Sequence, residues 1–190
     1  MENRVVFAKA TEALKHDHRV IEKVLAVLER LTESSGEISL EMWRQALDFI
    51  RNFADECHHL KEEKVLFPVL EEHGIPREGG PIGMMLLEHV EARGYVKAMA
   101  AALALAKEDP NATRTTLVEN ARAYLRLLRE HIRKEDEVLF EMADETLSPE
   151  EQKELLHQFE EHEEREIGSG VHEKYLGIAA ELEREGYLQA

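Results

Sequence analysis

The chain has 190 residues, of which 43% are hydrophobic, and a formal net charge of -16. This length is enough for one domain with a sizeable core, and the acidic balance argues against nucleic acid or an anionic membrane as a partner. Cys57 is the sole cysteine, which excludes an intramolecular disulfide and a metal site made only of thiolates. No apolar run approaches about 20 residues and no apolar leader opens the sequence, so we expect no membrane span and a cytoplasmic location.

Long stretches without Gly or Pro carry apolar residues at steps of three and four, so the chain is expected to be all-α. Helices are predicted at about residues 8–33, 39–73, 82–107 and 113–145. The first should end at Ser34-Ser35-Gly36, and the Gly- and Pro-rich stretch 74–83 should be a loop. Pro68 should kink the second helix or loosen its last turn. Four long helices with short connections predict an up-down-up-down four-helix bundle spanning residues 1–146.

A second helical part is expected from residue 147 to residue 190. Ser148-Pro149-Glu150-Glu151 has the cap, the proline and the acids of a helix start. That helix should end at Gly168-Ser169-Gly170, and a last short helix should reach about residue 185. We expect these two helices to pack on the bundle or on a second subunit, so a homodimer is one prediction.

Each apolar seam of the four long helices contains a histidine, and two seams also contain a glutamate. These residues are His18 in the first helix, His58 and Glu62 in the second, His89 in the third, and His131 and Glu135 in the fourth. A buried carboxylate needs a proton, a partner or a bound cation. Four imidazoles beside two carboxylates are typical metal ligands, although histidines hydrogen-bonded to carboxylates in a core are the alternative.

Two of the helices share a repeat, HHLKEEKVLF at residues 58–67 and HIRKEDEVLF at residues 131–140. The His-x-x-x-Glu spacing places both side chains on one helix face, one turn apart. Two such units facing each other suit two metal ions that share the carboxylates. His59 and Glu63 form the same spacing rotated by one residue, but Ile132 occupies the place of His59 in the repeat, which favours His58 and Glu62.

With this pattern, residues 8–145 resemble the hemerythrin-like, HHE cation-binding family. The resemblance implies two non-heme iron ions (Fe) bridged by carboxylates, whereas the ligand types alone would also admit manganese or zinc. Oxygen-carrying hemerythrins have His-x-x-x-His on the third helix, but Met85 and Arg93 lie four residues from His89. The remaining coordination position would go to Tyr124, to His162 or to solvent. His16, His73, His157 and His172 are expected to be exposed or capping residues.

Three classes of function follow. The first is binding or sensing of a small diatomic ligand such as oxygen or nitric oxide, or of iron itself, because the mostly aliphatic seams offer no obvious general acid. The second is a di-iron enzyme that acts on peroxide or nitric oxide, or in repair of damaged iron centres, with Tyr124 as a donor. The third is a bundle that a metal such as zinc only stabilises.

Overall fold

A computed structural model describes residues 6–34, 39–168 and 170–188, and this part of the chain is helical without strands. The predicted all-α fold is therefore confirmed for the described residues. In chain order the elements are α1 (Ala10–Glu33), α2 (Leu40–Phe49), η1 (Ile50–His59), η2 (Glu62–Leu66), α3 (Phe67–Glu72), α4 (Pro81–Ala104), α5 (Pro110–Lys134), η3 (Glu135–Leu139), α6 (Phe140–Thr146), α7 (Pro149–His162), η4 (Glu163–Ile167) and α8 (Val171–Leu188).

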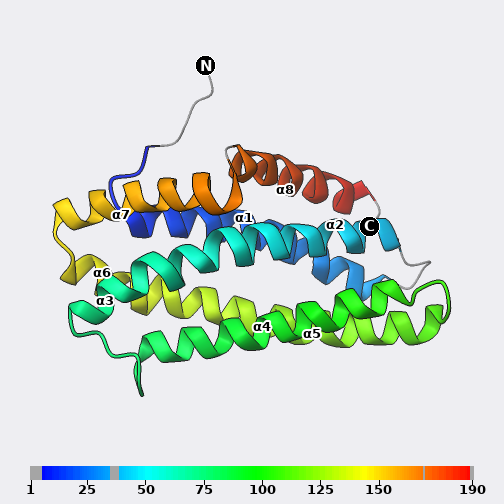
Figure 1. The fold of residues 1–190 in the computed structure, drawn as a ribbon. Helices are drawn as coiled ribbons and strands as arrows, with labels where there is room; N and C mark the ends of the chain where they lie inside the picture. Colours follow the sequence, from blue (N-terminus) through cyan, green and yellow to red (C-terminus); the bar gives the residue numbers. More distant parts are fainter. Residues whose placement is uncertain (1–5, 35–38, 169, 189–190) are drawn as a thin grey trace.

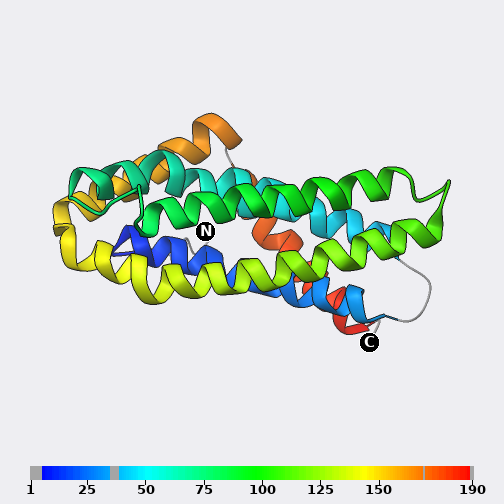
Figure 2. The ribbon, with the colours of Figure 1, turned by 90° about the horizontal axis from the view of Figure 1, so that it is seen from below.

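Four long helical stretches lie side by side: α1, the run from α2 to α3, α4, and the run from α5 to α6 (Figure 1). The view from below shows α4 and α5 lying along each other over most of their length (Figure 2). The C-terminal helices α7 and α8 follow one another along the outside of α1. No described helix is long and apolar enough to cross a membrane.

The helix ends follow local chemistry. Asp109 caps α5 by accepting a hydrogen bond from the backbone N–H of Ala112, so α5 begins at Pro110 and not near residue 113 as predicted. Ser148 and Glu151 form the capping box of α7. Helix α4 ends at Ala104, earlier than the predicted residue 107. The predicted turn at Ser35-Gly36 and the middle of the predicted turn at Gly168–Gly170 lie outside the described residues.

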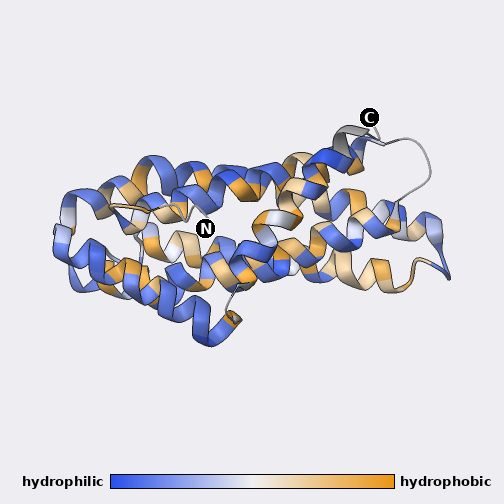
Figure 3. Ribbon diagram, turned by 90° about the horizontal axis from the view of Figure 1, so that it is seen from above, coloured by the Kyte–Doolittle hydropathy of each residue, from blue (hydrophilic) through white to orange (hydrophobic). Residues whose placement is uncertain are grey.

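The buried apolar residues form two clusters, one toward each end of the long helices. One cluster contains the starts of α1 and α4 with α3 and α6, and the other contains the opposite halves of the same stretches. Along each helix the buried histidines and glutamates fall between these two clusters. Residues of opposite hydropathy alternate along the helices, as helices with one apolar face require (Figure 3).

Three π-helical segments adjoin these buried polar residues. Segment η1 ends at His58 and His59, whereas η2 begins at Glu62 and η3 begins at Glu135. Such segments are rare and frequently occur at functional sites. Pro68 stands in the first turn of α3, directly after η2, where a helix tolerates proline. The departure from regular α-helix in this stretch lies on the N-terminal side of the proline, in η1 and η2, whereas the turn that contains Pro68 is α-helical.

Candidate metal centre

The structure brings together all six residues that the seams predicted. Each of them is at most 1% exposed. They form two groups whose ligand atoms lie within 4.8 Å of one another. The first group is His18, His58, Glu62 and Glu135, and the second is Glu62, His89, His131 and Glu135. Because both glutamates belong to both groups, the arrangement has the form of two adjoining sites with two shared carboxylates.

The Nε2 atoms of the histidines face the two glutamates. Glu62 lies 3.4 Å from Nε2 of His58 through one oxygen and 3.5 Å from Nε2 of His89 through the other. Glu135 Oε2 lies 3.3 Å from Nε2 of His18 and 3.2 Å from Nε2 of His131. Glu62 therefore links the second helical stretch to α4, and Glu135 links the fourth stretch to α1. His89 and His131, whose Nε2 atoms lie 3.1 Å apart, join the two pairs.

His59 is a further member of the centre that the sequence reasoning set aside. Its side chain is 3% exposed, its ring stacks on that of His89 with centroids 4.0 Å apart, and it forms a third group with His89 and His131. The wider turn of η1 lets the neighbours His58 and His59 both reach the interior. The second helical stretch thus contributes two histidines to the centre. The centre therefore contains five histidines in all, although α4 contributes only His89.

A carboxylate faces the Nδ1 atom of each of these five histidines. The pairs are His18 with Asp136 at 2.7 Å, His58 with Asp17 at 3.4 Å, His59 with Asp55 at 3.4 Å, His89 with Glu63 at 2.8 Å, and His131 with Glu88 at 3.0 Å. Four of these pairs are hydrogen bonds, whereas Asp55 faces Nδ1 of His59 without a hydrogen bond. Hydrogen bonds of this kind fix the tautomer and orientation of metal-binding histidines and raise their basicity. The outer carboxylates therefore prepare the Nε2 atoms to bind a cation.

Arg93 stands four residues after His89, one turn further along α4. Its guanidinium lies 2.7 Å from Asp55 and 2.8 Å from Glu63. These are the carboxylates that face His59 and His89. The arginine therefore does not coordinate a metal itself but holds the supports of two candidate ligands.

The C-terminal helices complete the outer part of the centre. His172 of α8 lies 3.0 Å from Asp17, and the buried Lys61 ammonium lies 2.6 Å from Asp17 and 2.8 Å from Glu163 of η4. Asp17 in turn faces His58. The expectation that His172 is exposed or capping was wrong, since its side chain is 17% exposed and paired. Cys57, Glu163 and His172 form another group whose ligand atoms lie close together. The carboxylate of Glu163 in this group is already paired with the Lys61 ammonium.

The electrostatics of the inner residues fit a cation. The orphaned buried polar atoms include Nε2 of His18 and His58 and all four carboxylate oxygens of Glu62 and Glu135. Burial and the neighbouring Glu135 raise the pKa of Glu62 well above its usual range. Burial would also raise the pKa of Glu135, but the neighbouring His131 and His18 hold that pKa well below its usual range. Burial lowers the pKa of His58 to about 4, against the opposite effect of Asp17, so its imidazole is neutral and able to bind a metal.

The remaining candidate ligands and histidines differ in their surroundings. Tyr124 is buried and lines a cavity beside His59. His162 is half-buried, and among the described residues no group that could hold a metal contains it. The side chain of His157 is 64% exposed, as predicted. His73 pairs with Glu151 near the surface, also consistent with the prediction.

Comparison with known proteins agrees with the site. Residues 9–143 match the model of the hemerythrin HHE cation-binding domain. Uncharacterized proteins of Mycobacterium bovis and of two strains of Mycobacterium tuberculosis are 24% identical over 178 residues, which cover 92% of this chain and 69% of each relative. No solved structure matches the chain significantly. Because the family match covers more than half of the chain and includes all the residues of the two groups, the chain belongs to the hemerythrin HHE cation-binding family.

Proposed function

We propose that this protein holds two non-heme iron ions and reversibly binds or senses a small ligand, oxygen or nitric oxide, at them. The observation that carries the proposal is the pair of four-residue groups that share Glu62 and Glu135. Nitrogen and oxygen ligands in this mixture suit iron. Bound iron would supply the change of oxidation state that accompanies binding of such ligands.

The histidines lie on two sides of the shared glutamates, and this arrangement supports two ions and not one. His18 and His58 lie on one side of the glutamates, and His59, His89 and His131 lie on the other. The second side has one more imidazole than the first, so the first side has the greater room for an external ligand. In this proposal residues 1–146 form an up-down-up-down bundle around the centre, and residues 147–190 are an appendage that supports Asp17.

Metal analysis with ligand variants tests the proposal. The protein should be loaded anaerobically with ferrous iron, freed of excess metal and assayed for iron per chain, with the absorption spectrum recorded before and after oxygen or nitric oxide is added. We expect two irons per chain and a reversible spectral change. His58→Ala and His131→Ala should each lose iron, because each removes a ligand from a different group.

His157→Ala is the matched control, since it removes an exposed histidine far from the groups in sequence and should keep both irons. Retention of both irons by His58→Ala or His131→Ala would refute the ligand set. Two irons with no spectral response to either gas would refute the binding role and leave the metal site in place.

A further inference from the structure

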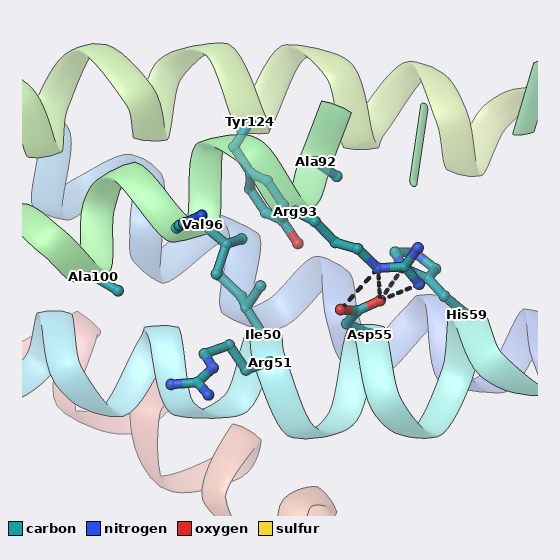
Figure 4. Close-up of a pocket in the computed structure, with 10 residues that line it drawn as sticks. Ile50, Arg51, Asp55, His59, Ala92, Arg93, Val96, Ala100 and Tyr124 are labelled. Carbon is teal, nitrogen blue, oxygen red and sulfur yellow. Dashed lines mark hydrogen bonds and ion pairs between the residues drawn. The ribbon is translucent and has the colours of Figure 1, made fainter. Parts of the chain in front are cut away.

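A cavity of about 300 Å³ lies between η1 and α4, with Tyr124 of α5 at its back (Figure 4). A water molecule, which is similar in size to a diatomic gas, occupies about 30 Å³ in the liquid. The cavity is therefore much larger than the ligand proposed for the metal centre needs. Its volume falls at the lower end of the range of small-molecule sites.

The inner lining of this cavity is mostly apolar. Ile50, Ala92, Val96 and Ala100 contribute aliphatic surface from its two helical walls. Two buried polar side chains also line it: the imidazole of His59, and the phenol of Tyr124, which is 1% exposed and points into the middle of the lining residues (Figure 4). Buried tyrosine hydroxyls usually have a hydrogen-bond partner, but within the described part of the chain nothing accepts from this one. Burial raises the pKa of Tyr124 far above its usual range, so its hydroxyl remains a donor.

The rim of the cavity is positively charged. Arg51, Arg93 and Lys97 line it together with a single carboxylate, that of Asp55. Asp55 is engaged by Arg93, whereas Arg51 and Lys97 are exposed and form no ion pair with any described residue. In a chain with a net charge of -16, two unpaired cations at the mouth of one cavity favour an anionic ligand.

We propose that this cavity is a second binding site, which takes a small organic carboxylate with an apolar body. The carboxylate lies toward Arg51 and Lys97, the body lies between Ile50 and Val96, and an acceptor atom of the ligand receives the hydrogen bond of Tyr124. None of the five residues given these roles belongs to a group that could hold a metal, and the cavity adjoins the metal centre only through His59, which also lines it.

The test uses benzoate as the probe, benzamide as its uncharged match and 4-hydroxybenzoate as a probe with an added acceptor. Binding is measured by titration calorimetry and by amide NMR shifts, on metal-free and on iron-loaded full-length protein. We expect benzoate to bind, benzamide to bind at least threefold more weakly, and shifts to centre on residues 50–59, 92–100 and 124. Equal affinity for benzoate and benzamide, or shifts centred elsewhere, would overturn the proposal.

Single substitutions test what the charged rim and the apolar cavity each contribute to benzoate binding. Lys97→Ala should weaken benzoate about threefold, as expected for one exposed charge, whereas Lys64→Ala, an exposed cation outside the lining, should not. Val96→Trp and Ala100→Phe fill the cavity and should weaken benzoate at least tenfold. Leu87→Trp is their control, because Leu87 lies on the same helix and is 68% exposed. Unchanged affinity in a folded cavity-filling variant would refute the site.

Tyr124→Phe isolates the hydroxyl. It should remove any advantage of 4-hydroxybenzoate over benzoate and leave benzoate nearly unchanged, which is the pattern of a double-mutant cycle with one specific hydrogen bond. An advantage that persists in Tyr124→Phe would show that the phenol does not donate to the ligand. Binding of benzoate to the iron-loaded protein alone would show that its carboxylate coordinates iron and would refute a separate site. Failure of iron loading itself would bear only on the proposed function.

Discussion

The two His-x-x-x-Glu units have nearly the same sequence and differ in what they contribute. In the unit at Glu62, the residues His58 and His59 are both buried and both belong to metal groups. In the unit at Glu135, His131 is a candidate ligand, but the next residue, Ile132, is buried in the apolar core. Both glutamates begin a π-helical segment, so the difference lies before the glutamates and not after them.

The two units differ in the neighbours that surround the residue after the first histidine. Asp55 lies four residues before His59 and faces its Nδ1 atom. The residue four before Ile132 is Leu128, which is apolar and buried. The second unit therefore has a partner for one imidazole, supplied by Glu88 of α4, and the first has partners for two. The outer carboxylates, more than the repeat itself, set how many histidines each unit presents.

The largest expected effect on iron binding comes from a substitution that gives the unit at Glu62 the isoleucine of the unit at Glu135. His59→Ile should remove the ligand that belongs only to the group with His89 and His131, so iron should fall from two ions per chain to one. His18→Ala removes a ligand from the opposite group and should also leave one ion. Metal analysis of the two variants and of the double variant measures this, and the double variant should bind no iron. Two irons in His59→Ile would show that His59 is a spectator.

A smaller effect is expected from removing the support of a ligand. Asp55→Asn should lower iron affinity about 10- to 100-fold, the usual cost of losing a carboxylate behind a metal-bound histidine. Competition with a chelator of known affinity measures the change. Asp136→Asn is the matched variant behind His18 on the other side of the centre. If both variants released the same ion first, the assignment of carboxylates to separate ions would be wrong.

The smallest effect on metal binding is expected from the reverse substitution, which gives the unit at Glu135 the second histidine of the unit at Glu62. Ile132→His should bind no additional iron, because Ile132 lies in the apolar core and the residue one turn before it is Leu128, not a carboxylate. It should instead lower the free energy of unfolding by about 1–3 kcal/mol, since it buries a polar group without a partner. Urea unfolding and metal analysis of the same preparation separate the two effects. A gain of iron per chain would contradict the role given to the outer carboxylates.

The four helix seams placed six candidate ligands correctly in one interior cluster, because α-helical periodicity alone fixes which residues share a face. His59 was set aside because that reasoning assumed a regular α-helix and a strict repeat. Two signals in the chain could have corrected it: Asp55 stands one turn before His59, and Arg93 stands one turn after His89, where it holds Asp55. The place of His172 could not be predicted, since its partner Asp17 is 155 residues away.

The sequence by itself determined the all-α class, the interior face of each long helix and six of the His and Glu residues of the centre, since these depend on spacing within one helix. Only the tertiary structure decided that η1 turns both His58 and His59 inward. It also decided that Asp136, Asp17, Glu63 and Glu88 reach histidines of other helical stretches. The physical reason is that these contacts depend on the depth and rotation at which helices pack against one another, which no single helix specifies.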